Sequence, residues 1–301
     1  MRMSVVVNVH AGTNFSQFRE AADSVLAQDH KDFELIVVTA DAPDIRARIE
    51  DRYADHPAVR TVILDIDEGL SAARNAGAEA STGEVVVFTD DDVVTDPSWL
   101  SSLVEVYENE NPVGVGGHVN PIWPEDIPWH LPAEFYWLVG VVHKGFVDER
   151  RTQRVRNTFG CNISFDRDTF LAAGGFRDDL GKNQKNPLQG EEAELCARIG
   201  GEFWYTPDAI VQHRVDDDQL SLRYLTRRSF WQGYSKAALT KDTGEESLFL
   251  RQLFLQSIPQ RIRSPSFSSI GQVVMLLSLT ISVGLGFLYA KVRARVSSPI
   301  N

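Results

Sequence analysis

Short apolar runs alternate with amphipathic stretches over the first 90 residues of the chain, and this alternation limits the fold more than any other feature. The apolar runs, rich in valine, isoleucine and leucine, lie at residues 4–9, 33–39, 59–64 and 85–88. The stretches with helical character lie between them, at residues 15–27, 45–53 and 70–80. Strands that alternate with helices form a mostly parallel sheet with helices on both faces. The sequence therefore predicts an α/β fold, with its ligand site at the carboxyl ends of the strands.

The charge balance of the chain excludes one large class of partner. The 301 residues include 42 acidic and 30 basic side chains, which gives a net charge of −12. A protein that grips nucleic acid through its phosphates needs the opposite balance, so we expect no nucleic acid partner. Cys161 and Cys196 are the only cysteines. In a chain too large to need disulfide staples, we expect both to be reduced, buried thiols.

Residues 270–290 depart from the pattern of a soluble protein. This segment contains no charged residue, is rich in Val, Leu, Ile and Phe, and has about the length needed to cross the hydrocarbon core of a bilayer. It predicts one transmembrane helix. A buried helix of the globular core is the alternative, although the glycines within the segment would weaken a helix in water.

The flanks of this segment bear on topology and on domain organisation. Basic residues lie on both sides in nearly equal number, so charge alone does not orient the helix. The N-terminus has no cleavable signal pattern, so we expect the bulk of the chain to stay in the cytoplasm. Residues 220–265 mix cationic and apolar side chains in a way that suits a bilayer interface, with packing against the rest of the protein as the alternative. We therefore expect a folded domain over residues 1–219, amphipathic helices over 220–265, and a transmembrane helix with a short tail over 266–301.

Three consecutive carboxylates, Asp90, Asp91 and Asp92, follow the apolar run at residues 85–88. Adjacent carboxylates repel one another unless a cation or hydrogen-bond donors neutralise them. Hard oxygen ligands at the end of a strand suit Mg²⁺ or Mn²⁺, which keep several waters and bridge to substrate phosphates. The triplet therefore predicts a divalent metal site. A solvated acidic turn that starts a helix at residues 96–97 is the alternative.

Further short motifs occur on both sides of the triplet. Residues 69–77 read GLSAARNAG and residues 82–84 read TGE. With them the chain resembles glycosyltransferase family 2, whose members have a G-L-x-x-A-R-N-x-G helix, a T-G-E turn and an apolar strand that ends in D-x-D. The resemblance continues, in the family's order, through GCNISF at 160–165, GGF at 174–176, GEEAEL at 190–195 and YTPDA at 205–209. It covers residues 3–235, and the ordered set of motifs is highly specific.

The resemblance implies a GT-A fold, in which a nucleotide-binding half built like a Rossmann unit precedes an acceptor-binding half, and a reaction that inverts the anomeric carbon. It assigns Asp90 to the ribose or the metal shell and Asp92 to the metal that faces the diphosphate, with Asp91 among the residues that bind the nucleotide sugar. His213 matches a histidine that completes the metal shell in some members, and a structural histidine is the alternative. The metal would act as a Lewis acid on the departing nucleoside diphosphate.

Two further positions concern the binding of the nucleotide-sugar donor. The resemblance places Arg74 near the diphosphate, which suits the planar donors of a guanidinium, and a surface arginine on a helix is the alternative. The family's uracil-binding turn reads D-D-G-S after the second strand, whereas residues 38–43 of this chain read VTADAP. Asp41 is the acidic residue left in this turn to reach the base. The departure weakens the preference for uridine that the family's turn provides.

The base of the reaction is expected near the GEEAEL motif. An inverting displacement needs a group that takes the proton of the acceptor hydroxyl as it attacks, and a carboxylate is the usual provider. Glu192 matches the family's base, with Glu where the family's G-E-D pattern has Asp. Glu191 is its rival for this role.

The type of transferase follows from what surrounds these motifs. The chain lacks the Q-x-x-R-W motif of processive synthases and has one predicted span, so we expect the addition of a single sugar. It resembles archaeal membrane-associated glycosyltransferases that assemble dolichol-phosphate-linked glycans for protein N-glycosylation, some of which transfer a hexuronic acid. That implies a UDP-linked nucleotide-sugar donor, a lipid-linked saccharide acceptor, and a catalytic domain on the cytoplasmic side of the cell membrane, which the chain crosses once. The alternatives are a polyprenyl-phosphate hexose synthase and a non-catalytic, membrane-tethered binding module.

Overall fold

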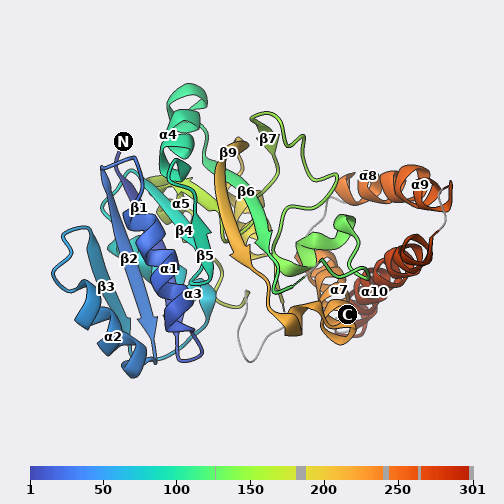
Figure 1. Ribbon diagram of the computed structural model, residues 1–301, viewed down its shortest axis with the longest axis horizontal. Helices are drawn as coiled ribbons and strands as arrows, with labels where there is room; N and C mark the ends of the chain where they lie inside the picture. The colour runs from blue at the N-terminus through green and yellow to red at the C-terminus, as the bar shows by residue number, and fades with distance from the viewer. Residues whose placement is uncertain (126, 181–187, 240–243, 264–265, 298–301) are drawn as a thin grey trace. The chain divides into compact units, whose positions relative to one another are not determined.

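The computed structural model describes residues 1–125, 127–180, 188–239, 244–263 and 266–297, and they form two compact units (Figure 1). Unit 1 comprises Met1–Pro121, Asp148–Pro187 and Glu191–Arg214. Unit 2 comprises Ile122–Val147, Leu188–Gly190 and Val215–Asn301. The units interleave along the chain, so packing and not chain order decides the unit of each segment. The domain boundaries predicted after residues 219 and 265 stay a prediction.

The N-terminal half of unit 1 is a parallel sheet covered by helices. The parallel strands are β1 (Met3–His10), β2 (Phe33–Ala40), β3 (Val59–Leu64) and β4 (Val85–Thr89), in the spatial order β3-β2-β1-β4. The helices that connect them are α1 (Phe15–Leu26), α2 (Pro43–Tyr53) and α3 (Leu70–Ala80). The alternation of apolar runs and helices thus predicted each of these elements to within two residues at either end, and the α/β class is confirmed.

Antiparallel strands extend this sheet beyond β4. The added strands follow β4 in the order β8 (Ile163–Asp166), β6 (Gly114–Ile122), β9 (Phe203–Arg214) and β5 (Val93–Thr95), and β7 (Gln153–Val155) pairs with β9. The helices of this half are α4 (Trp99–Glu110), α5 (Arg167–Ala172) and α6 (Glu191–Ile199). β5 begins directly after the carboxylate triplet and pairs with β9. The end of β9 therefore lies at the same edge of the sheet as the triplet.

Close packing between α3 and the sheet sets the position of the site. Gly77 on α3 faces β1 and β2, and a Cβ at this position would collide with Val6 and lie 3.0 Å from Val38. The missing side chain lets α3 rest directly on the strands. Arg74 lies one turn earlier on the same helix, so this contact fixes its height above the sheet.

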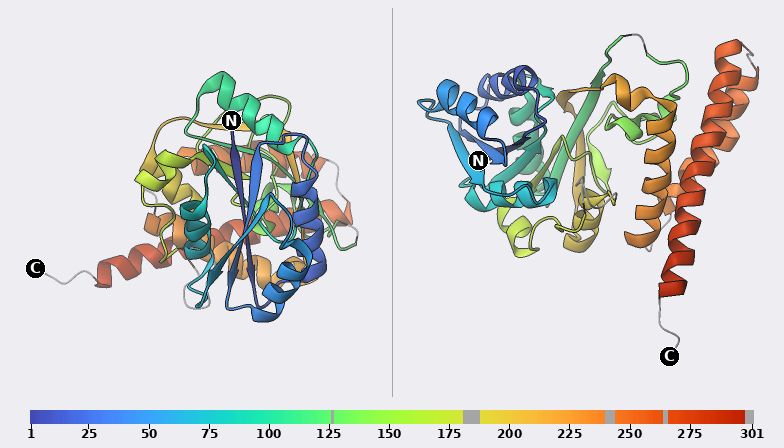
Figure 2. Two further views of the ribbon diagram at one scale, coloured as in Figure 1. Left: turned by 90° about the vertical axis from the view of Figure 1, so that its left-hand side faces the viewer. Right: turned by 90° about the horizontal axis from the view of Figure 1, so that it is seen from below.

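Unit 2 is helical in the residues that the structure describes. Its elements are the 3-10 helices η1 (Ala133–Val139) and η2 (Asp217–Leu220), then α7 (Leu222–Leu239), α8 (Gly244–Gln252), the π-helical turn η3 (Leu253–Ser257), α9 (Ile258–Arg263) and α10 (Phe267–Ser297). The two long helices, α7 and α10, lie side by side (Figure 2). Leu225 of α7 and Leu276 and Leu279 of α10 are fully buried in the core of the unit.

The apolar segment at the C-terminus is confirmed as a helix, and α10 extends it at both ends. Within Phe267–Arg295 an 18-residue window has a mean hydropathy of 2.1, and within the described ranges this is the helix whose length and composition allow it to cross a membrane. A bidentate ion pair ties α9 to η1, since both guanidinium Nη atoms of Arg261 donate to the buried carboxylate of Glu134 at 3.0 and 2.9 Å. Arg261 Nε also donates to Gln272 Oε1 of α10 at 2.9 Å.

Candidate active site

Seven of the eight site residues predicted from the sequence lie together at the carboxyl edge of the parallel strands. They are Arg74 on α3, Asp90, Asp91 and Asp92 after β4, Glu191 and Glu192 at the start of α6, and His213 on β9. In a parallel sheet this edge gathers the loops from several strands, which is why residues more than 100 positions apart in the sequence become neighbours here.

Arg74 is the centre of this group. Its side chain is 1% exposed, and its Nη2 lies 3.0 Å from Asp90 Oδ1 while its Nη1 lies 3.3 Å from Glu192 Oε1 and 3.8 Å from Glu191 Oε1. Nη2 also donates to the carbonyl oxygen of Gly160 at 3.0 Å. Although burial disfavours the charged form, these carboxylates hold the pKa of Arg74 above its usual range. The alternative of a surface arginine is therefore wrong.

One guanidinium shared among three carboxylates leaves this group with an excess of negative charge. The consequence is clearest at Glu192, whose side chain is 18% exposed. Burial, and after it the negative charge of Glu191, raise the pKa of Glu192 to about 7 against the opposing influence of Arg74. A carboxyl group with a pKa near neutrality can both accept and release a proton at physiological pH, which is the property of a general base.

Asp92 and His213 face each other across the end of the sheet. His213 Nε2 lies 3.6 Å from Asp92 Oδ2, and the backbone fixes this pair because β5 and β9 are in register at Val93 and His213. The carbonyl oxygen of Asp92 also accepts the backbone N–H of Arg214 at 3.3 Å. A carboxylate oxygen and an imidazole nitrogen form a suitable partial ligand set for Mn²⁺ or Mg²⁺. Within the described ranges, no three side chains of His, Cys, Asp or Glu are grouped closely enough to hold an ion alone.

Asp91 has a different environment from its two neighbours. Its Oδ2 accepts a hydrogen bond from the hydroxyl of Thr13, which lies in the turn between β1 and α1. Burial is the main cause that raises the pKa of Asp91. The contact ties the turn after β1 to the carboxylate triplet. Thr13 was not among the site residues predicted from the sequence, although a Gly-Thr-Asn turn directly after an apolar run was the signal that could have identified it.

Asp41 is the predicted site residue that stands apart. It is exposed at the end of β2, with a left-handed φ of 44°, and its backbone N–H donates to the carbonyl oxygen of Leu64 at 3.3 Å. In the part of the chain that the structure describes, no hydrogen bond or ion pair joins its side chain to the other seven residues. Since β1 lies between β2 and β4, Asp41 and Asp90 are two strand spacings apart, roughly 10 Å across the sheet edge.

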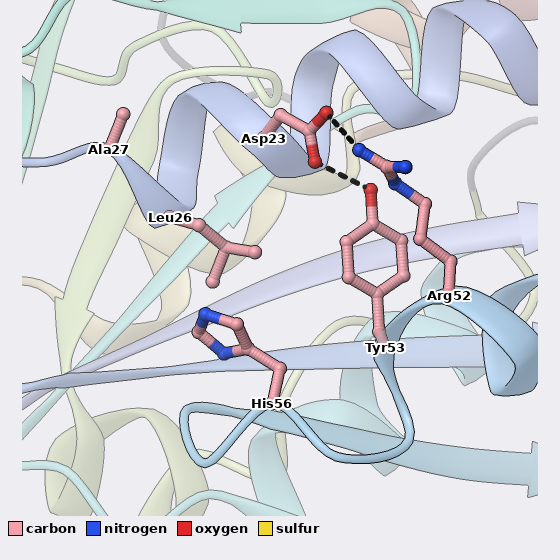
Figure 3. A pocket seen from close by; sticks show the side chains of 6 residues that line it. All are labelled: Asp23, Leu26, Ala27, Arg52, Tyr53 and His56. Carbon is pink, nitrogen blue, oxygen red and sulfur yellow. Dashed lines mark hydrogen bonds and ion pairs between the residues drawn. The ribbon is translucent and has the colours of Figure 1, made fainter.

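A shallow hollow on unit 1 lies at the opposite edge of the sheet (Figure 3). It is lined by Asp23, Leu26, Ala27, Arg52, Tyr53 and His56. Asp23 accepts hydrogen bonds of 2.8 Å from Arg52 and from Tyr53. The hollow lies at the C-terminal ends of α1 and α2, and connecting helices run opposite to the strands of a parallel sheet. The length of the strands therefore separates it from the carboxylates.

Comparison with known sequences agrees with this geometry. The family model for glycosyl transferase family 2 matches residues 4–176. The chain is 36% identical to a glucosyl-dolichyl phosphate glucuronosyltransferase of Haloferax volcanii over 303 residues, which cover 96% of each chain. It is 28% identical to the succinoglycan biosynthesis protein ExoM of Rhizobium meliloti, over 68% of this chain and 64% of that protein.

Solved structures show the same architecture. A mannosyltransferase of Pyrobaculum calidifontis in complex with GDP-Man and Mn²⁺ is 17% identical, with a TM-score of 0.62, over 96% of this chain and 88% of that chain. GalNAc-T7 with UDP, GalNAc and Mn²⁺ is 18% identical, with a TM-score of 0.58, over 88% of this chain but only 57% of that one. At such identities the likeness establishes the fold, and the predicted GT-A fold is confirmed. Because the family model covers more than half of the sequence and one relative is 36% identical along its length, the chain is a glycosyltransferase that belongs to glycosyl transferase family 2.

Proposed function

We propose that the protein transfers one sugar from a UDP-linked donor to a lipid-linked saccharide on dolichol phosphate, with inversion, during the assembly of a glycan for protein N-glycosylation. The sugar is a hexuronic acid, in line with the activity named for the Haloferax relative. The observation that carries the catalytic part of this proposal is the buried contact of Arg74 with Glu192 and Asp90, beside a base whose pKa is about 7.

Glu192 acts as the base in this scheme. It takes the proton of an acceptor hydroxyl while that oxygen attacks the anomeric carbon of the donor sugar. The new glycosidic bond forms on the face opposite the breaking bond, whose electron pair leaves with the nucleoside diphosphate. Glu191, which is 8% exposed at the same helix start, keeps the pKa of Glu192 high through its charge. This division of roles favours Glu192 over Glu191 as the base.

Arg74 and Asp90 position the donor. The Nη atoms of the buried Arg74 guanidinium already pair with Asp90 and Glu192, so a diphosphate that enters the site would accept hydrogen bonds from Arg74 as one of these carboxylates moves aside. Asp90 binds the ribose or the metal shell next to it. Asp91 holds the turn after β1 through Thr13, and Asp41, two strands away, is the residue proposed to contact the nucleobase.

A divalent metal, Mn²⁺ or Mg²⁺, completes the donor site. Asp92 and His213 would hold the ion, with Asp90 adjacent, and the oxygens of the diphosphate and water would supply the ligands that this set lacks. When bound, the ion stabilises the charge that develops on the departing diphosphate. The excess of carboxylates around Arg74 favours a cation at this edge of the sheet.

Association with a membrane accounts for the C-terminal helix. The length and apolar composition of α10 suit it to anchor the protein to the cell membrane, where a lipid-linked acceptor is held. We propose that the catalytic residues face the cytoplasm. An apolar helix can anchor a protein either by crossing the bilayer, as the composition predicts, or by lying in its interface.

The experiment that tests the function is release of nucleoside diphosphate from a panel of UDP-sugars, with Mn²⁺ or Mg²⁺, in the presence of glucosyl-dolichyl phosphate or of bare dolichyl phosphate. We expect one UDP-hexuronate to support release that requires the glycosylated lipid. Glu192→Gln and Asp92→Asn should each lower that release by roughly 100-fold or more. Glu194→Gln is the matched control, since Glu194 lies on the same helix but pairs with Arg198.

The other outcomes of this assay discriminate between functions. Release with bare dolichyl phosphate, and a product that is a phosphodiester, would assign the protein to the polyprenyl-phosphate hexose synthases. A third outcome is that no donor and no lipid gives release, and that Glu192→Gln keeps the biological activity of the wild type. The protein would then be a non-catalytic, membrane-tethered binding module.

A further inference from the structure

The two faces of α10 have different surroundings within unit 2. One face packs on α7 and the core of the unit, and its buried residues are Leu276, Leu279, Ser282, Gly286 and Ala290. The opposite face carries an apolar stripe at intervals of three and four residues, which places its members in one line along the helix. The stripe consists of Ile270, Val274, Leu277, Ile281, Leu285 and Leu288, and these side chains are between 38% and 61% exposed.

α10 and α7 are in close contact over several turns. Ser282 Oγ donates to the carbonyl oxygen of Thr226 at 2.9 Å. A Cβ on Gly286 would collide with the carbonyl oxygen of Phe230, and one on Gly233 would collide with that of Val283. Small residues on both helices thus let the backbones touch, and the ring of Tyr289 lies 5.8 Å from that of Phe230, centroid to centroid. The two helices form one packed layer (Figure 2).

This packing determines which residues would accompany α10 into a bilayer. Thr226 is level with Ser282, near the middle of the apolar stretch, and Arg227 and Arg228 follow Thr226 directly on α7. If α10 crossed the membrane in this arrangement, both arginines would be carried to the depth of the hydrocarbon core, where a cationic side chain is costly. A helix that binds the membrane along its length keeps α7 on the protein side.

The charge distribution points to the chemistry of the surface that covers the stripe. From residue 222 to the C-terminus the sequence contains 11 Lys or Arg and only 3 Asp or Glu, in a chain whose net charge is −12. Exposed cations, Lys291, Arg293 and Arg295, end α10. At its start the rings of Trp129 and Phe267, which are 52% and 89% exposed, lie 6.3 Å apart. Apolar side chains with aromatic and cationic flanks suit an interface with anionic lipid head groups.

We propose that α10 lies lengthwise in the interface of a membrane with anionic head groups, with its exposed stripe toward the acyl chains and its α7-packed face toward the protein, instead of crossing the bilayer. The inference rests on the proposed membrane association and goes beyond it by assigning the geometry of binding. Exposed apolar residues on the neighbouring helices, Leu248, Phe254, Leu255 and Ile262, extend the same kind of surface.

The test compares the two ends of α10 in the full chain. Ser268→Cys and Arg295→Cys each place a thiol at an exposed position near one end of the helix. The native thiols of Cys161 and Cys196 are buried, so labelling of the wild type measures the background reaction. Spheroplasts of expressing cells are treated with a membrane-impermeant maleimide before and after lysis. We expect both ends to react alike, protected in intact spheroplasts and labelled after lysis. Labelling of one end only in intact spheroplasts would mean that the helix crosses, and the inference would fall.

A second measurement tests the stripe itself. The purified full chain is bound to vesicles of phosphatidylcholine and phosphatidylglycerol, and Ile281→Asn is compared with Ile63→Asn, an isoleucine that is 49% exposed on β3 in unit 1. We expect Ile281→Asn to weaken vesicle binding by roughly tenfold and Ile63→Asn to leave it unchanged. Equal binding by both variants would overturn the role of the stripe. Absence of binding by the wild type would overturn the proposed membrane association as well, whereas neither result bears on nucleoside diphosphate release.

Discussion

Arg74 Nη1 lies 3.3 Å from Glu192 Oε1, so a buried ion pair joins a helix of the parallel half of the sheet to the start of α6. The same guanidinium holds Asp90 at 3.0 Å. The residue assigned to the donor diphosphate and the residue assigned to the acceptor proton are therefore electrostatically coupled. Any change to one of them alters the protonation or the position of the other.

The first prediction concerns the pH dependence of transfer. Because the pKa of Glu192 is raised to about 7, the carboxyl group is increasingly protonated below that pH and no longer accepts a proton. We expect kcat to fall about tenfold per pH unit on the acid side of 7. Glu191→Gln removes a charge that raises this pKa, so its acid limb should move to lower pH. A pH profile of kcat for both proteins checks this, and coincident acid limbs would contradict the assignment of Glu192 as the base.

The second prediction concerns the stability that Arg74 provides. Arg74→Met leaves Asp90, Glu191 and Glu192 without their shared cation, which should cost about 3 kcal/mol in the free energy of unfolding. The loss should be larger at pH 8 than at pH 6, because the carboxylates can protonate at the lower pH. Denaturant unfolding measures this effect. Arg52→Met, which breaks an exposed, solvent-screened pair with Asp23, should cost much less than Arg74→Met, and an equal loss in the two variants would refute the central role of Arg74.

The third prediction separates the roles of the adjacent aspartates. Asp92→Asn should raise the Mn²⁺ concentration that gives half-maximal activity by about 100-fold, since it removes a charged ligand next to His213. Asp91→Asn should change that Mn²⁺ concentration by less than about threefold. Because Asp91 contacts Thr13, Asp91→Asn should instead raise the KM for the donor, as Thr13→Val should. Metal titrations at fixed donor concentration distinguish the two. Equal metal dependence in both aspartate variants would contradict this division.

The fourth prediction uses the close approach of Gly160 to the base. A Cβ at Gly160 would collide with Glu192 Oε1 and lie 3.0 Å from Arg74 Nη1. Gly160→Ala should therefore displace the carboxylate and lower kcat by roughly 10- to 100-fold. Gly284→Ala is the control, because among the described residues a Cβ at Gly284 would meet no atom within 4 Å beyond its chain neighbours and the nearby backbone of its own helix. If Gly160→Ala retained the wild-type kcat, the position of Glu192 relative to the acceptor would not limit the reaction.

The fifth prediction concerns a buried carboxylate outside the site. Although burial opposes it, hydrogen bonds from Thr82 and Ser4 and the pair with Arg60 lower the pKa of Glu34 to about 2. A lowered pKa gives stability that is present above the unfolded value of 4.5 and is lost as the pH falls toward 2. Glu34→Gln should therefore cost about 1–3 kcal/mol at pH 7 and clearly less near pH 3, where part of this stability is already lost. Unfolding at the two pH values tests this, and a loss independent of pH would contradict it.

Much of the site could be predicted because its residues lie in short motifs tied to elements with a clear pattern. The carboxylate triplet follows an apolar run that became β4, and the GLSAARNAG motif became α3. The environment of each side chain could not be predicted in this way. The burial of Arg74 depends on Gly160 and on α6, both more than 80 residues further along the chain, and the isolation of Asp41 depends on the strand order.

Periodicity, apolar runs and motifs are local properties of the chain, and they were enough to predict the parallel strands with their helices, the apolar C-terminal helix and the family. The pairing of Asp92 with His213, the bond between Asp91 and Thr13, and the packing of α10 along α7 with one apolar face exposed arise from the folded arrangement. These relationships depend on long-range packing and on antiparallel strands that return to one edge of the sheet. Their partners are separated by tens of residues, and no local pattern records such distances.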